Sequence, residues 1–241
     1  MRPLGSSFFA VVVAAGVGER MNAALPKQYL PLLGKPVLAH TLEAFERFEP
    51  VAEVTVVIHP LHEKIFEREI LERYRFRKVR RYVFGGATRQ DSVYEGVKVY
   101  RDHPEDFVLI HDGVRPLVGE EVLWRCVEGL RKHEAICVAI PSVDTLKLSL
   151  DGQTVQKTLD RRTVWRAQTP QAFRVGLILQ AFEQARKEGF QGTDDASLVE
   201  RLGVPVYLVL GSEENLKITT PQDFLLAEEM LRFRVRWSRT G

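Results

Sequence analysis

The sequence predicts an α/β fold with a mostly parallel, twisted sheet flanked by helices, on three observations. Short apolar runs alternate with amphipathic runs along the chain, as in successive β-α-β units. The first run, 8–14 (FFAVVVA), is apolar throughout, which is typical of a strand buried on both faces. A glycine-containing loop follows that run directly, at the edge where parallel sheets bind their ligands.

The remaining elements follow from the same patterns. The run 54–58 (VTVVI) is a second buried strand that Pro60 stops. In 37–48, Leu38, Leu42 and Phe45 share one helical face. The last helix begins with Thr220 as N-cap, Pro221 and the capping-box residue Asp223. Further strands are expected at 80–84, 107–111, 135–141 and 205–210, and helices at 37–48, 61–73, 120–132, 176–188, 193–203 and 220–233.

A hairpin interrupts this alternation. Residues 145–150 alternate strictly, Asp151-Gly152 forms a two-residue turn, and 154–159 returns. Leu146, Leu148 and Leu150 then share one face, which a lone hairpin cannot bury by itself. Two interpretations remain: an edge hairpin that covers its own domain, or an arm at about 142–163 that contacts a second subunit. The exposed apolar stripe favours the arm and hence a homodimer.

Composition narrows the class of protein. The chain has 241 residues, a formal net charge of +2, 45% hydrophobic and 27% charged residues, which excludes a disordered chain or a coiled coil. The near-balance of charge does not indicate bulk nucleic-acid binding. Two isolated cysteines, Cys126 and Cys137, and no long apolar run predict a cytoplasmic chain outside the membrane. With no repeat or linker, one domain spanning 1–241 is expected.

The loop at 14–21 (AAGVGERM) indicates phosphate binding. It does not match the dinucleotide fingerprint, because Met21 replaces the small third residue and His59 follows the second strand where an acid is expected. It is not a Walker loop either. Arg20 and Lys27 lie close by, and backbone amides with two cations suit a triphosphate.

These residues carry a family resemblance. The loop 14–21 followed by Pro-Lys-Gln at 26–28 resembles the signature of the 2-C-methyl-D-erythritol 4-phosphate cytidylyltransferases of the non-mevalonate isoprenoid route. The similarity runs along nearly the whole chain and implies a single Rossmann-like nucleotidyltransferase domain with a protruding arm. Further motifs in family order are 85–93 (GGATRQDSV), 111–116 (HDGVRP), 144–147 (DTLK), 160–161 with 168–171 (DR and QTPQ), 193–197 (TDDAS) and 215–219 (NLKIT).

The resemblance implies that CTP and methylerythritol phosphate give CDP-methylerythritol and pyrophosphate. A phosphate oxygen of the acceptor attacks the α-phosphorus of CTP, so the site needs cations and alignment rather than a strong base. Arg20 and Lys27 would stabilise the transition state, and Arg161 and Lys217 would position the acceptor phosphate. Arg162 is adjacent to Arg161, and the sequence does not decide which of the two positions the acceptor phosphate.

The resemblance also assigns the binding residues. Asp112 is the candidate protein ligand for Mg²⁺ or another divalent cation. The CTP phosphates would supply most of the ligands of that cation. Ser92 and Thr193 could equally act as helix N-caps. The nucleotide would bind at Ala14, Ala15, Gly16, Gly18, Gly85, Gly86, Ser92 and Asp112, and the acceptor at Asp112, Gly113, Arg115, Thr145, Arg161, Thr193 and Lys217.

Three other functions are weighed against this one. A ribitol 5-phosphate cytidylyltransferase would share the CTP loop and the cations. A sugar-1-phosphate nucleotidyltransferase would use another nucleotide. A non-catalytic nucleotide-binding regulator would need the glycines but not the combination of Arg20, Lys27, Asp112, Arg161 and Lys217.

Overall fold

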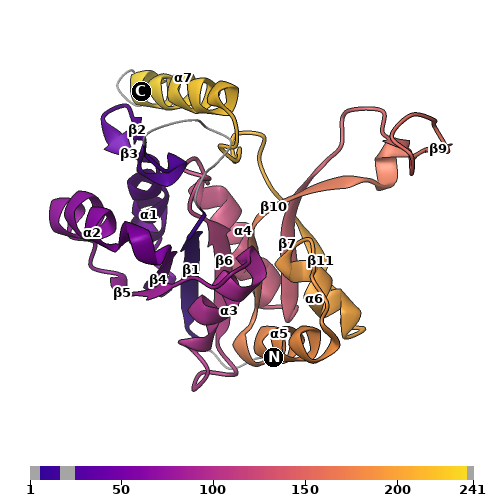
Figure 1. The fold of residues 1–241 in the computed structure, drawn as a ribbon, viewed down its shortest axis with the longest axis horizontal. Helices are drawn as coiled ribbons and strands as arrows, with labels where there is room; N and C mark the ends of the chain where they lie inside the picture. The colour runs from indigo at the N-terminus through magenta and orange to yellow at the C-terminus, as the bar shows by residue number, and fades with distance from the viewer. Residues whose placement is uncertain (1–5, 17–24, 238–241) are drawn as a thin grey trace.

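The computed structural model describes residues 6–16 and 25–237, and its centre is a seven-stranded sheet (Figure 1). The strand order is β11-β7-β10-β6-β1-β4-β5, and all neighbours are parallel except β10, which runs antiparallel to β6 and β7. The mostly parallel sheet expected from the apolar runs is confirmed. The strands are β1 (Phe8–Ala14), β4 (Val51–Ile58), β5 (Val79–Phe84), β6 (Phe107–Asp112), β7 (Ala135–Pro141), β10 (Trp165–Arg174) and β11 (Tyr207–Leu210).

Helices cover both faces of the sheet. Residues of β1 point alternately to the two sides, so that Val12 belongs to one apolar cluster and Val11 to the other. The first cluster contains residues of α1 (Val37–Arg47), of α4 (Glu120–Leu130), and of the helical segment that begins with α2 (Glu63–Phe66). The second contains α3 (Arg89–Lys98), α5 (Val175–Glu188) and α6 (Asp195–Arg201).

The last helix, α7 (Pro221–Trp237), lies apart from these layers, near the short pair β2 (Pro31–Leu32) and β3 (Lys35–Pro36) (Figure 1). It begins as predicted: Asp223 N donates to Thr220 Oγ1 at 3.2 Å, and Thr220 N donates to Asp223 Oδ2 at 2.8 Å. Within residues 6–16 and 25–237, no helix is both long and apolar enough to cross a membrane.

Two elements differ from the prediction. Strand β10 was not predicted, because Arg166, Gln168 and Gln171 interrupt its apolar character and Pro170 cannot donate to a ladder. Helix α3 begins earlier than the expected start at Ser92. Its N-cap is Thr88, whose Oγ1 accepts from Asp91 N at 3.0 Å, so the N-cap role considered for Ser92 is wrong.

The hairpin projects from the sheet as an arm (Figure 1). Its paired strands are only β8 (Lys147–Leu148) and β9 (Lys157–Thr158), so the predicted two-residue turn at Asp151-Gly152 is wrong. Asp151 instead organises the longer loop at 149–156 by accepting from Gln153 N at 2.9 Å and Thr154 N at 2.8 Å. Leu148 is 42% exposed and Leu150 is 77% exposed, so these leucines do not cover their own sheet.

Candidate active site

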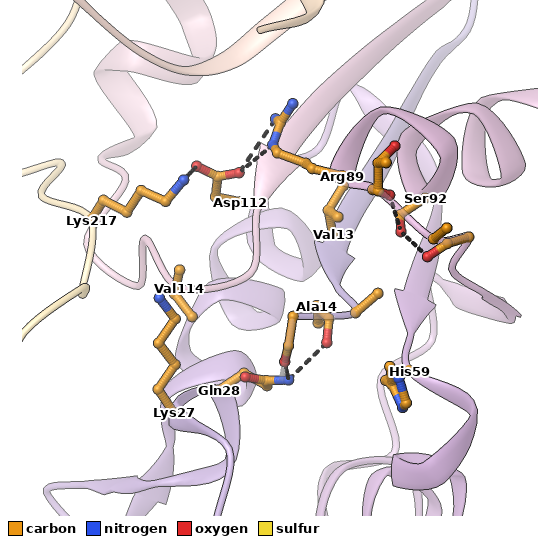
Figure 2. Close-up of a pocket in the computed structure, with 15 residues that line it drawn as sticks. Val13, Ala14, Lys27, Gln28, His59, Arg89, Ser92, Asp112, Val114 and Lys217 are labelled. Atoms are coloured by element: carbon orange, nitrogen blue, oxygen red, sulfur yellow. Dashed lines mark hydrogen bonds and ion pairs between the residues drawn. The ribbon is translucent and has the colours of Figure 1, made fainter. Parts of the chain in front are cut away.

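A cavity of about 400 Å³ opens at the carboxyl edge of β1, β4 and β6 (Figure 2). This is the edge at which parallel sheets bind ligands. The residues lining it come from segments far apart in the sequence, which the sheet brings together. They are Val13, Ala14, Ala15, Gly16, Lys27, Gln28, His59, Gly86, Ala87, Thr88, Arg89, Ser92, Asp112, Val114 and Lys217.

Gln28 ties the Lys27 segment to the end of β1. Its buried side chain donates from Nε2 to the carbonyl oxygens of Ala14 and Gly16, both at 2.8 Å (Figure 2). This contact fixes the short 3₁₀ turn Lys27–Tyr29 against the first strand and brings Lys27 to the cavity wall. The predicted residues Gly18 and Arg20 lie outside the described residues.

The second glycine motif forms the opposite side of the cavity. A Cβ on Gly85 would lie 2.6 Å from both Ala15 Cβ and Ser92 Oγ, so the two loops approach closely only because residue 85 is glycine. Ser92 is buried, and its Oγ donates to the Thr88 carbonyl oxygen at 2.9 Å. Gly86 and Ser92 line the cavity, whereas Gly85 supports its wall.

Asp112 is the centre of the charged groups at this edge. One oxygen, Oδ2, lies 2.9 Å from Lys217 Nζ and 3.5 Å from Arg115 Nε. The other, Oδ1, lies 3.4 Å from Arg89 Nη2, so that Asp112 stands between Lys217 and Arg89 (Figure 2). Burial alone would raise the pKa of Asp112, but the three cations hold it well below its usual range. The carboxylate is therefore ionised and already engaged by cations.

Arg89 joins Asp112 to a second buried carboxylate. Its Nη1 and Nη2 donate to the two oxygens of Asp195 at 3.1 and 3.0 Å, the forked geometry that an Arg–carboxylate pair prefers. Asp195 is only 1% exposed. Burial raises the pKa of Asp195 above its usual value, and Arg89 offsets only part of that effect.

His111 holds the turn that carries Asp112 and Arg115. Its Nε2 lies 3.2 Å from the Arg115 carbonyl oxygen, which only accepts, so Nε2 carries the proton. Its Nδ1 then accepts from Thr169 Oγ1 at 3.0 Å, and Thr169 Oγ1 accepts from Asp112 N at 3.1 Å. Burial lowers the pKa of His111 to about 4, so the ring is neutral at pH 7.

A second cavity of about 300 Å³ adjoins the first and shares Arg89, Asp112 and Lys217 with it. It suits a second ligand placed next to the first. Thr193 lines it, but the helix N-cap is Asp194, whose side chain accepts from Ser197 N, so the N-cap role considered for Thr193 is wrong. Its other lining residues are Arg115, Ala167, Gln168, Thr169, Gln171 and Asp194.

Three predicted residues lie elsewhere. Gly113 contributes close packing, since a Cβ there would lie 3.0 Å from the Val13 carbonyl oxygen. Thr145 and Arg161 lie at the exposed base of the arm and line neither cavity. Arg162 is paired with Asp160 through Nη2 at 2.6 Å, whereas Arg161 donates to the Val143 carbonyl oxygen at 3.4 Å.

The donor set for a metal is small. Asp112 is the acidic residue that lines both cavities, and its two oxygens face three cations. Within the described part of the chain, no group of three or more His, Cys, Asp or Glu side chains is placed to hold a metal. These residues do not fit a magnesium ion held by the protein alone, although CTP phosphates could carry one.

Sequence reasoning missed Gln28, Arg89 and Asp195 as members of the site. Each lies inside a motif noted above: Gln28 in Pro-Lys-Gln, Arg89 in the second glycine motif and Asp195 in 193–197. A buried amide or ion pair needs partners, and the partners of these side chains lie up to 106 residues away.

Fold and site together define a class of protein. A mostly parallel sheet, a glycine-containing loop after β1, and lysines at two adjoining cavities are the features of an α/β nucleotidyltransferase. Residues 8–233 match the family model of 2-C-methyl-D-erythritol 4-phosphate cytidylyltransferase (IspD). The chain belongs to this family.

Individual relatives agree with this assignment. A protein of this name from Geobacter metallireducens is 49% identical over 227 residues, which cover 93% of this chain and 97% of the relative. One from Geobacillus thermodenitrificans is 44% identical, over 95% and 99% of the two chains. The crystal structure of 4-diphosphocytidyl-2C-methyl-D-erythritol synthase from Anaerococcus prevotii superimposes with a TM-score of 0.83 at 37% identity, over 94% and 96%.

Proposed function

We propose that this enzyme transfers CMP from CTP to 2-C-methyl-D-erythritol 4-phosphate and releases pyrophosphate. Membership of the family supports the reaction. The observation that carries it is the pair of adjoining cavities, which share Asp112 and Lys217 and so provide for two anionic ligands side by side. CTP would occupy the larger cavity, beside Lys27 and the glycine motifs, and the acceptor would occupy the smaller one.

The chemistry needs charge neutralisation and alignment. The acceptor phosphate is already ionised, so no residue has to abstract a proton before its oxygen attacks the α-phosphorus. Lys27, with Arg20, would neutralise the charge that builds on the α-phosphate and the departing pyrophosphate. Lys217 would hold the acceptor phosphate in line, since it lines both cavities.

Backbone groups would bind the nucleotide. The ends of β1 and β5 place Ala14, Ala15, Gly16 and Gly86 around the larger cavity, where their amides and small side chains permit close approach of the ligand. Arg115 and Thr193 line the smaller cavity and would contact the acceptor. Magnesium bound to the CTP phosphates would supply further charge neutralisation, and none of the steps above depends on it.

The arm would complete the site of a second copy of the chain. Thr145 and Arg161 lie on the arm away from their own cavities, and Leu148, Leu150 and Val155 expose an apolar surface there. A homodimer that buries this surface would bring Arg161 to the partner's acceptor phosphate. The pairing of Arg162 with Asp160 supports Arg161 as the phosphate-binding residue.

A cytoplasmic location stays a prediction.

The arm hypothesis has a direct test. Lys27→Ala and Arg161→Ala should each be inactive alone. After subunit exchange of an equal mixture, about a quarter of wild-type activity should return, because half the dimers are mixed and each mixed dimer has one intact site. No recovery in verified mixed dimers would show that Arg161 serves its own chain, and an active Arg161→Ala homodimer would show that it has no role.

The reaction is tested by measuring the release of pyrophosphate from CTP in the presence of Mg²⁺. Parallel assays contain methylerythritol 4-phosphate, ribitol 5-phosphate or no acceptor. Release with methylerythritol 4-phosphate alone is expected. Release only with ribitol 5-phosphate would keep the CTP site and change the acceptor. CTP binding without release in any assay would favour a nucleotide-binding regulator.

A further inference from the structure

Arg89 occupies an unusual position in the wall between the two cavities. It lines both of them, and it bridges two carboxylates, one from a strand and one from a helix. Asp112 ends β6, whereas Asp195 begins α6. A guanidinium that is about one-third exposed and forked onto a carboxylate at 1% exposure is fixed in place rather than free to follow a ligand.

Lys217 has the opposite character. Its side chain is 38% exposed, against 8% for the side chain of Asp112, and it contacts Asp112 through a single flexible ammonium group 2.9 Å from Oδ2. The ammonium has three N–H donors, so a phosphate can engage those not directed at Asp112, and its attraction draws Nζ away from Oδ2 and weakens that contact. A phosphate dianion attracts it more strongly than a carboxylate monoanion does.

The cost of that move depends on what else Asp112 contacts. When Lys217 leaves, Arg89 still faces Oδ1 at 3.4 Å and Arg115 still faces Oδ2 at 3.5 Å. Without Arg89, the buried Asp112 would lose one of these partners and face the unpaired Asp195. Lys217 would then be the main partner for the excess negative charge, and its release would become more costly.

We propose that Arg89 is a positioning residue that keeps Asp112 paired while Lys217 moves to the acceptor phosphate. The inference rests on the proposed function, because it assigns Lys217 to that phosphate. It predicts a selective effect on the acceptor: Arg89 contributes little to CTP affinity, and its loss weakens acceptor binding through Asp112 and Lys217.

The test compares steady-state kinetics of wild type, Arg89→Gln and Arg186→Gln. Arg186 is the matched control. Like Arg89 it pairs with a carboxylate, in this case Asp91 of α3 at 3.3 Å, but it lines neither cavity. Arg89→Gln should raise the KM for methylerythritol phosphate about tenfold or more and change the KM for CTP less than about threefold. Arg186→Gln should change neither. A fall in kcat with both KM values unchanged, or the same effect in Arg186→Gln, would overturn the proposal.

A double-mutant cycle tests the route through Asp112. In an Asp112→Asn background, Lys217 is no longer held by a carboxylate, so Arg89→Gln should add little to the acceptor KM. Multiplicative effects would contradict the proposed coupling. Wild-type enzyme that releases no pyrophosphate would instead refute the proposed function itself.

Two further variants distinguish a loss of folding from a loss of the positioning role of Arg89. Arg89→Gln leaves Asp195 buried without its arginine, and Arg89→Gln/Asp195→Asn removes that charge while Asp112 still lacks Arg89. The double variant should fold and keep the raised acceptor KM. Arg89→Lys should recover part of the acceptor affinity, because it restores the charge without the fork. A folded double variant with wild-type acceptor KM would refute the positioning role.

Discussion

The neutral, buried His111 makes the stability of this protein sensitive to mild acid. Its ring is inaccessible to solvent and donates to the Arg115 carbonyl oxygen while accepting from Thr169. Burial lowers its pKa from 6.5 to about 4 in the folded protein. In the unfolded chain the ring titrates near the ordinary value. Between these two values the unfolded chain therefore binds a proton that the folded protein does not.

The size of the effect follows from linkage. As the pH falls below 6.5, protonation of the unfolded chain lowers the free energy of unfolding, and the loss ends once the folded protein also binds the proton near pH 4. The full difference corresponds to about 3 kcal/mol. Between pH 8 and pH 5, the loss is about 2 kcal/mol. The contribution of the neutral His111 to the free energy of unfolding is fully present above its pKa in the unfolded chain and is lost as the pH falls towards its pKa in the folded protein.

Urea unfolding at several pH values measures this directly for wild type and His111→Gln. The variant should be less stable at pH 8, because its side chain alters the hydrogen bonds that His111 makes with Arg115 and Thr169. Its stability should fall less between pH 8 and pH 5, by about 2 kcal/mol relative to wild type. Other titrating groups, such as His40 and His62 with their lowered pKa values, are present in both proteins and cancel. Parallel pH profiles for the two proteins would refute a neutral, buried His111.

Three further predictions concern four single substitutions. Lys27→Ala should raise the barrier of the transfer step by about 3 kcal/mol, measured as single-turnover pyrophosphate release; wild-type turnover would remove Lys27 from the chemistry. Gly85→Ala should weaken CTP binding by about 1–3 kcal/mol in calorimetry, because its Cβ would meet Ala15 and Ser92 at 2.6 Å; unchanged affinity would mean that the loops separate without cost. Thr88→Ala and Thr220→Ala each remove a capping box and should each lower stability by about 1 kcal/mol, but only Thr88→Ala, at the cavity, should raise the KM for CTP.

Local patterns determined much of the fold. The apolar run at 8–14 and the run at 54–58 predicted parallel, doubly buried strands, and both are now neighbours in the sheet. The Thr220–Asp223 capping box was equally readable. Each of these features depends on residues within a few positions of one another, so the sequence alone contains the information. The glycine loop and Lys27 were predicted as a unit for the same reason.

Tertiary structure alone decided how distant segments meet. Strand β10 is mixed in polarity, and its antiparallel place between β6 and β7 follows from pairing with strands that come from other parts of the chain. The arm carries Leu148, Leu150 and Val155, and the described part of the chain leaves all three exposed. Arg89 looks like an ordinary charged residue at a helix start until α6 brings Asp195 to it, across 106 positions. The sequence by itself determined the strands, the caps and the phosphate-binding loop. The charge network around Asp112 was decided only in three dimensions, because a buried charge is stabilised by whichever partners the fold places next to it.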